Sequence, residues 1–243
     1  WRVAAIVISE AQGVRQLHFG SRWVQGAMRI ARPWSLELEY TRQMMLPLAL
    51  RAPGRWPARV LQVGLGAASV TRFLHRHRPL ARITVVEILP EVVAAARQYF
   101  RLPDDPARLR IEIGDGHEFL AASRDRFDLV LVDGFDGDGR AGMLDSLPFH
   151  LNCRARLSGS GVAAYNLLDR GRGTKAAVAR LREAFGEGML VLPRCAAGNT
   201  VVLAGALAPL RGCAKALRER ALALREQTGL DLLALVEALP PGG

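Results

Sequence analysis

The stretch that decides the fold is RVLQVGLGAAS, residues 59–69. It begins as a run of β-type residues and ends at two glycines, Gly64 and Gly66, that are one residue apart. Such a strand end is typical of sheets that bind nucleosides, because the first glycine permits a tight turn and the second lets a ligand approach the backbone. A Gly-x-Gly pair alone decides little, however, since an ordinary turn would also explain it.

Beyond this stretch, strands and helices alternate along the chain. The patterns predict further strands at residues 81–88, 109–115, 127–133, 161–168, 188–194 and 199–205, with helices between most of them. Nearly all-apolar strands that alternate with helices indicate a parallel sheet covered on both faces. The last two strands are joined by a short loop, so we expect one of them to be antiparallel. The fold class is therefore α/β, with a doubly wound sheet.

Two smaller units flank this sheet. Short β-type runs before residue 31 predict a small antiparallel unit, and residues 36–46 have the spacing of a connecting helix. The Pro/Gly-rich residues 51–58 form the best domain boundary. We therefore divide the chain into an N-terminal β-unit with its helix (residues 1–50), a nucleoside-binding catalytic domain (51–205) and a helical tail (206–243). The apolar stripe of the tail could pack on the chain's own sheet or on a second subunit.

The composition limits the cellular locations and the kinds of binding partner that we expect. The 243 residues include 33 Lys and Arg against 23 Asp and Glu, a formal charge of +10, but the arginines are scattered and do not favour a nucleic-acid partner. No apolar run approaches the roughly 18 residues of a membrane span. The three cysteines lack metal-type spacing, which favours a reducing compartment and a cytoplasmic location. Because the first residue is Trp1, we expect the sequence to start inside a longer chain.

Carboxylates follow several of the predicted strands, where a doubly wound sheet binds its ligands. Glu87 ends the second strand and could accept hydrogen bonds from both ribose hydroxyls of an adenosine, although a solvated strand end would look the same. Asp115, followed by Gly116, ends the third strand in the place of a carboxylate that receives the adenine amino group. A pyrophosphate fingerprint would need glycine at Ser69. We therefore favour a phosphate-free adenosine such as S-adenosylmethionine.

The fourth strand ends in a run of aspartates, LVLVDGFDGDG at residues 129–139. Like charges this close raise each other's pKa and are unfavourable unless a cation compensates them. A sulfonium or a protonated amine would serve, with Asp133 taking a proton from an attacking amine and Asp136 holding a second ammonium group. The alternative is that the Gly-Asp repeat is only a polar turn.

Several motifs in this order resemble the spermidine synthase (polyamine aminopropyltransferase) family, especially its divergent bacterial spermidine synthase-like branch. They are LELEY (36–40), VLQVGLG (60–66), VVEILPEVV (85–93), DGHEFL (115–120), LVLVDGFD (129–136) and NTVVLA (199–204). The resemblance implies a Rossmann-like methyltransferase-type fold behind a small β-unit. It also implies decarboxylated S-adenosylmethionine as donor, a diamine such as putrescine as acceptor, no metal, and a homodimer.

The resemblance also implies roles for particular residues. Asp133 would be the catalytic base, and Tyr40 would orient the base or the attacking amine. Asp136 and Glu37 would bind the amine substrate. The donor would lie against Gln25, Gly64, Gly66, Glu87, Asp115 and Gly116.

The sequence departs from the family mainly on the acceptor side. Ala67 stands where the family has an aspartate that meets the donor's propylamine, and Thr41-Arg42 replaces His-Glu. The loop at residues 193–198 lacks the family's acceptor-contacting tyrosine, and Gly134 begins a changed segment after the base.

Three functions therefore stand at this point. Aminopropyl transfer is the main prediction. Methyl transfer from ordinary S-adenosylmethionine is favoured by Ala67 and the basic surface. A non-catalytic homologue that binds nucleosides or polyamines is favoured by the changed acceptor loop.

Overall fold

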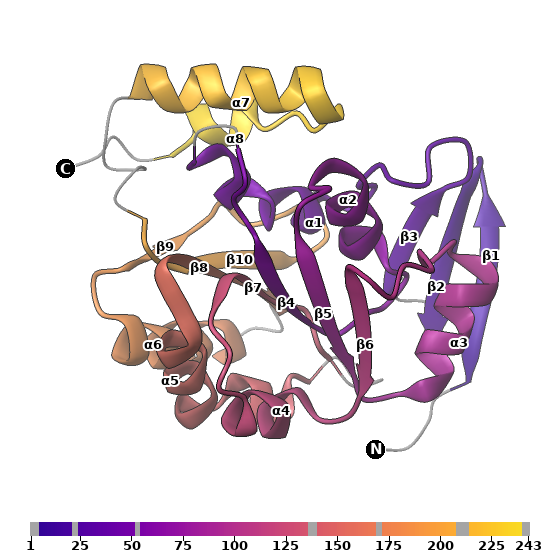
Figure 1. The fold of residues 1–243 in the computed structure, drawn as a ribbon, viewed down its shortest axis with the longest axis horizontal. Coiled ribbons are helices and arrows are strands. Elements are labelled where there is room, and N and C mark those ends of the chain that lie inside the picture. The colour runs from indigo at the N-terminus through magenta and orange to yellow at the C-terminus, as the bar shows by residue number, and fades with distance from the viewer. Residues whose placement is uncertain are drawn as a thin grey trace.

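A seven-stranded sheet forms the centre of the molecule (Figure 1). The computed structural model describes residues 5–20, 24–51, 54–135, 140–168, 172–207 and 214–239. The strand order is β6-β5-β4-β7-β8-β10-β9. The strands are β4 (Arg59–Val63), β5 (Arg82–Glu87), β6 (Leu109–Ile113), β7 (Phe127–Val132), β8 (Leu157–Leu168), β9 (Met189–Val191) and β10 (Asn199–Gly205).

The pairing confirms the predicted doubly wound sheet. Strands β4 to β8 pair in parallel, whereas β10 is antiparallel to both β8 and β9, as expected for the short final connection. The chain runs outward from β4 through β5 to β6, and then returns to the other side of β4 as β7. Val63 at the end of β4 pairs with Val86 and Val132 on its two neighbours, so the three strand ends meet at one switch point.

Alternate residues of the strands face two cores, because side chains in a strand point to opposite faces. The core on one face contains Val60 and Leu129 and is covered by helices α2 (Ser69–His77) and α3 (Pro90–Tyr99). The core on the other face contains Leu61 and Val130. It is covered by α4 (Gly116–Ala122), α5 (Leu147–Arg156) and α6 (Arg172–Phe185).

The tail packs on its own chain, which decides between the two alternatives for its apolar stripe. Helix α7 (Ala214–Thr228) buries Leu217, Ala221 and Leu224 in the same core as Val60, and α8 (Leu233–Glu237) adds Val236. Figure 1 shows α7 in yellow along the top of the molecule. In the part of the chain that the structure describes, no helix is long and apolar enough to span a bilayer.

The predicted N-terminal unit is a three-stranded antiparallel sheet of β1 (Ile6–Ala11), β2 (Val14–Phe19) and β3 (Gly26–Arg29). Its Leu17 and Met28 pack on Ala67, in the turn after β4, and on Phe100, just after α3. The buried guanidinium of Arg72 joins these parts, because it donates hydrogen bonds to the carbonyls of Pro33, Ala67 and Phe100. The β-unit is thus fixed to the turn that follows the first sheet strand.

Several predicted boundaries differ from those observed. The helix expected at 36–46 is a short α1 (Glu39–Gln43) followed by a 3-10 turn η1 (Leu46–Ala49), with Pro47 inside the turn. The helix between β7 and β8 is preceded by a 3-10 turn η2 (Gly142–Asp145), and α5 begins only at Leu147, with Pro148 in its first turn. The division of the chain at residues 50 and 205 stays a prediction.

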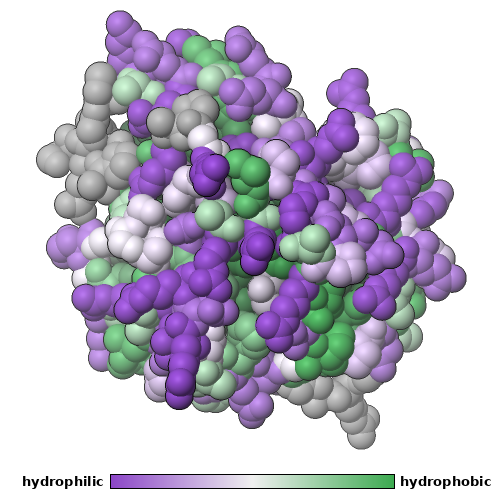
Figure 2. Space-filling model, in the orientation of Figure 1, coloured by the Kyte–Doolittle hydropathy of each residue, from purple (hydrophilic) through white to green (hydrophobic). Residues whose placement is uncertain are grey.

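Hydrophilic residues are spread over the face of the molecule in Figure 2 and are interrupted by apolar patches. This face thus has no single polar region that stands apart from the rest. The distribution agrees with the scattered arginines of the sequence.

Candidate active site

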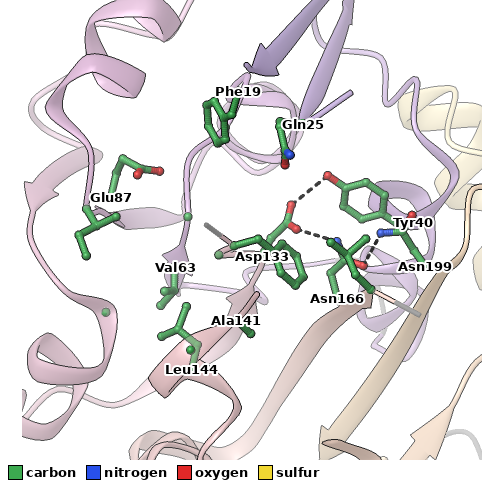
Figure 3. A pocket seen from close by; sticks show the side chains of 18 of the residues that line it. Phe19, Gln25, Tyr40, Val63, Glu87, Asp133, Ala141, Leu144, Asn166 and Asn199 are labelled. Atoms are coloured by element: carbon green, nitrogen blue, oxygen red, sulfur yellow. Dashed lines mark hydrogen bonds between the residues drawn. The ribbon is translucent and has the colours of Figure 1, made fainter. Parts of the chain in front are cut away.

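A cavity of about 840 Å³ opens at the carboxyl ends of the central strands (Figure 3). The walls come from the sheet, from the β-unit and from the segments that follow β7 and precede β10. Among the predicted residues, the cavity is lined by Gln25, Tyr40, Gly64, Gly66, Glu87, Asp115, Gly116 and Asp133. The structure therefore brings together eight side chains or backbone positions that the sequence assigned to one site.

The glycine turn after β4 requires its glycines. Gly64 has a φ of +88°, and a Cβ there would lie 2.2 Å from the carbonyl oxygen of Asp133. Gly66 has a φ of +50° and leaves the backbone open to the cavity. Gly116 is needed for a different reason, since a Cβ there would lie 2.3 Å from a methyl group of Val63. Side chains at Gly64 and Gly116 would displace the strand ends from one another.

Glu87 is held in place at the end of β5 and is only 6% exposed. Its Oε2 accepts a hydrogen bond of 2.8 Å from the amide of Leu65, and its Oε1 accepts one of 3.0 Å from the amide of Leu89. Burial raises the pKa of Glu87, and these backbone hydrogen bonds oppose the rise. Each carboxylate oxygen retains acceptor capacity, so the group can still receive hydroxyl donors from the cavity.

Asp115 has a structural role as well as a place in the cavity. It is the N-cap of α4, where its Oδ1 accepts hydrogen bonds from the amides of His117, at 2.7 Å, and Glu118, at 3.4 Å. Such a cap stabilises a helix by about 0.5–2 kcal/mol. The capping explains why an aspartate follows β6 even without a ligand, and it orients the carboxylate.

Asp133 is the centre of a hydrogen-bond network. Its Oδ2 accepts a bond of 3.1 Å from the hydroxyl of Tyr40, and its Oδ1 accepts one of 2.7 Å from Nδ2 of Asn166. Oδ1 of Asn166 in turn accepts a bond of 2.9 Å from Nδ2 of Asn199. Figure 3 shows the chain of bonds, with Glu87 on the other side of the cavity.

The environment of Asp133 makes it a weaker acid than usual. Burial raises its pKa to about 6, although the hydrogen bonds from Asn166 and Tyr40 lower it, and the charge of Glu87 adds to the rise. Burial also raises the pKa of Tyr40 far above its usual range, so its hydroxyl stays protonated and donates. A carboxylate with a pKa near 6 is suited to accept a proton at neutral pH.

Two functional candidates were missed by the sequence reasoning. Asn166 lies within β8, and Asn199 is the first residue of β10. Both are about 5% exposed and line the cavity. The signal for Asn166 was present, because an amide interrupts the apolar run GVAAYNLL and a buried amide needs partners. Only the pairing of β8 with β10 shows that the partner is Asn199.

Of the two predicted substrate-binding residues, only Glu37 belongs to the described part of the chain. Glu37 is outside the lining, because its carboxylate is held by Nε and Nη2 of Arg29 at 2.9 and 2.7 Å. Asp136 lies outside the described residues. Glu39, two positions after Glu37, lines the cavity instead, and its Oε2 accepts a hydrogen bond of 2.9 Å from the amide of Ala196. In the described lining, Glu39 therefore takes the place that was predicted for Glu37.

Ala67 does not face the ligand space. The side chain of Ala67 is 2% exposed, and a Cβ added to Gly26 would lie only 2.5 Å from the Cβ of Ala67. Because the two backbones are in such close contact, position 67 belongs to the packing between β3 and the glycine turn. The described lining has no acidic side chain from this turn.

The charged side chains of the described lining are mainly acidic, although the chain has a formal charge of +10. It carries four carboxylates, Glu39, Glu87, Asp115 and Asp133, against one guanidinium, that of Arg194. Such a cavity attracts a cation by its local charge. Within the described part of the chain, no group of three or more His, Cys, Asp and Glu side chains could hold a metal ion.

The fold and the site define a Rossmann-like α/β protein of the class that contains S-adenosyl-dependent transferases. Residues 39–166 match the spermine/spermidine synthase domain, and the chain belongs to the spermine/spermidine synthase family. The predicted family and the predicted transferase class are thereby confirmed.

The relatives are similar over nearly the whole chain. A polyamine aminopropyltransferase of Neisseria meningitidis serogroup A is 34% identical over 232 residues, which cover 96% of this chain and 88% of that protein. The crystal structure of a probable spermidine synthase from Corynebacterium glutamicum superposes with a TM-score of 0.73 at 19% identity, covering 93% and 91% of the two chains. Human methyltransferase-like protein 13, in complex with SAH, superposes with a TM-score of 0.70 at 26% identity, covering 79% and 92%. The two structures support the predicted Rossmann-like fold.

Proposed function

We propose that this chain transfers an aminopropyl group from decarboxylated S-adenosylmethionine to a small amine such as putrescine. The observation that carries the proposal is the half-buried Asp133, which is held by Tyr40 and Asn166 inside a cavity lined by further carboxylates. The names of the curated relatives, polyamine aminopropyltransferases, support the same reaction.

In this reaction the chain would bind two cations side by side. Glu87 and Asp115 would receive the ribose and adenine of the donor, and Gly64 and Gly66 would let it approach the backbone. Gln25, which points into the cavity in Figure 3, would lie near the donor. Glu39 would bind the acceptor amine, and the role of Asp136 in holding an ammonium group stays a prediction.

Asp133 would then act as the general base. It takes a proton from the acceptor's ammonium group, and the freed nitrogen lone pair attacks the carbon next to the sulfonium. The C–N bond forms as the C–S bond breaks, and the bonding electrons neutralise sulfur in the leaving methylthioadenosine. Base catalysis of this kind contributes about 10²–10⁴-fold, and holding the two reactants in line supplies a further large factor. Tyr40 and Asn166 would hold the carboxylate in position to accept the proton.

A second candidate is methyl transfer from ordinary S-adenosylmethionine. It is favoured by the absence of an acidic side chain of the glycine turn from the described lining, because a carboxylate there would repel the donor's own carboxylate. The structural likeness to human methyltransferase-like protein 13 is compatible with it. The two candidates differ in the group that leaves sulfur, so the products separate them.

The test is a product assay with the purified chain. We expect methylthioadenosine and spermidine from decarboxylated S-adenosylmethionine and putrescine, and no product when the donor is ordinary S-adenosylmethionine. Formation of S-adenosylhomocysteine from the ordinary donor would instead support methyl transfer. Binding of methylthioadenosine without turnover of either donor would favour the non-catalytic alternative. The homodimer and the cytoplasmic location remain predictions.

A further inference from the structure

A second, smaller cavity of about 180 Å³ lies at the opposite end of the sheet from the site above. It is bounded by η1, by the segments that lead into β4 and β5, by the end of α2 and by α7. Its charged and aromatic lining residues are Arg51, Arg55, Trp56, His77, Arg78 and Arg220. The tail therefore contributes to a pocket that the reaction proposed above does not use.

The charge of this cavity is uncompensated. Four arginines line it, and the described lining contains no carboxylate. None of the ion pairs within the described part of the chain includes Arg51, Arg55, Arg78 or Arg220. Burial, and then the charge of Arg220, lowers the pKa of Arg51, which indicates that the two guanidinium groups repel each other. Such a cluster favours binding of an anion.

The hydrogen bonds of these arginines leave donors unused. Nη2 of Arg51 donates to the carbonyls of Ser160 and Ala206 at 2.8 and 2.9 Å, and Nε of Arg220 donates to Ala49 at 2.7 Å. Nη1 of Arg78 donates to the carbonyl of His77 at 2.8 Å. Each guanidinium has five N–H donors, so further donors remain on all three. The carbonyl partners fix the side chains but carry no charge to neutralise them.

Arg78 has a partial explanation without any ligand, since it caps the C-terminus of α2, where cations are favourable. Arg220 lies inside α7 and donates to the carbonyl of Ala49, the last residue of η1, but this carbonyl does not neutralise its charge or that of Arg51. Two further groups lack partners here: Nε1 of Trp56 and Nε2 of His77 are buried and make no hydrogen bond within the described residues. Both residues line the cavity.

We infer that this cavity binds a phosphate group between Arg51, Arg55, Arg78 and Arg220. Planar guanidinium groups match the oxygens of a phosphate through paired, charge-assisted hydrogen bonds. The cavity is smaller than the roughly 300–1,000 Å³ of pockets for whole small molecules. It therefore suits a single phosphate group, either free or at the end of a larger soluble molecule whose remainder stays in solvent.

The experiment titrates the full chain with inorganic phosphate by calorimetry, at constant ionic strength and with acetate as a carboxylate control. We expect saturable binding of phosphate and a rise in Tm of about 2–4 °C at a phosphate concentration several times the Kd. The double variant Arg55→Gln, Arg78→Gln should weaken the affinity by about tenfold or more, because it removes charge-assisted donors. The matched control is Arg82→Gln, an exposed arginine next to the cavity that does not line it, and its affinity should be unchanged.

Two further measurements complete the test. The affinities of inorganic phosphate, pyrophosphate and AMP are compared, and the ligand that binds best shows whether the phosphate group is free or part of a nucleotide. The same double variant should weaken the binding of that ligand. Absence of saturable phosphate binding, equal binding of acetate, or unchanged affinity in a double variant that still folds would overturn the inference. Folding of each variant is checked by its Tm without phosphate. The inference does not depend on the reaction, because these variants lie outside the catalytic cavity.

Discussion

The hydroxyl of Tyr40 donates a 3.1 Å hydrogen bond to Oδ2 of Asp133 across 93 positions of the chain. Tyr40 belongs to the helix that connects the β-unit to the sheet, whereas Asp133 follows a central strand. The bond therefore ties the segment before the sheet to the proposed base.

Replacing Asp133 by Asn should abolish the base while keeping the shape of the side chain. We expect kcat to fall by about 10²–10⁴-fold, with the affinity for methylthioadenosine little changed, because the base would face the amine. Steady-state kinetics and calorimetry measure the two effects. Asp104→Asn, an exposed aspartate that does not line the cavity, is the control and should keep full activity. Unchanged turnover in Asp133→Asn would remove the assignment.

Replacing Tyr40 by Phe should shift the pH profile. The hydrogen bond from Tyr40 lowers the pKa of Asp133, so its loss should raise that pKa further above 6. The acid limb of kcat/KM against pH should therefore move to higher pH, with a lower plateau. A limb that stays in place while the plateau drops would mean that Tyr40 positions the substrate and not the base.

The raised pKa of Asp133 also predicts a cost in stability. Its folded pKa of about 6 lies above the usual unfolded value, so the folded state favours the protonated carboxyl group. The contribution of this group to stability is fully present below the unfolded pKa and is lost as pH rises through 6. At pH 8 the cost is about 2–3 kcal/mol. Asp133→Asn should therefore gain stability relative to the original chain on going from pH 4 to pH 8. Denaturant unfolding at both pH values measures the change, and a gain that does not depend on pH would contradict it.

Replacing Gly64 by Ala should destabilise the chain and disrupt the cavity. The new Cβ would lie 2.2 Å from the carbonyl oxygen of Asp133, and the φ of +88° is itself strained for alanine. We expect a loss of at least about 1–3 kcal/mol in the free energy of unfolding and little remaining activity. Gly159→Ala is the control, since a Cβ at Gly159 meets nothing within 4 Å. Equal stability of the two variants would contradict the steric argument.

The strand ends were readable from the sequence because parallel strands bring their carboxyl ends to one edge. Glu87, Asp115 and Asp133 each stand at the end of a predicted strand, and the structure places all three in one cavity. Asn199 was not readable in this way, since its contact with Asn166 depends on the pairing of β10 with β8.

The two glutamates before Tyr40 mark the limit of motif reasoning. Glu37 and Glu39 are two residues apart. Glu37 is held by its ion pair with Arg29, whereas Glu39 lines the cavity, and the motif alone does not show this difference. The sequence also did not predict the pocket at the opposite end of the sheet, because two of its arginines lie in the linker, one follows α2 and one lies in α7.

The buried Arg72 has a consequence for protein engineering. Its guanidinium bonds to carbonyls from three separate segments, at Pro33, Ala67 and Phe100. The β-unit therefore cannot be exchanged as an independent module between homologues. A chimera joined after residue 33 would take one of the three acceptor carbonyls from another protein and keep the other two. The contact between the β-unit and the turn after β4 would then no longer be held by Arg72.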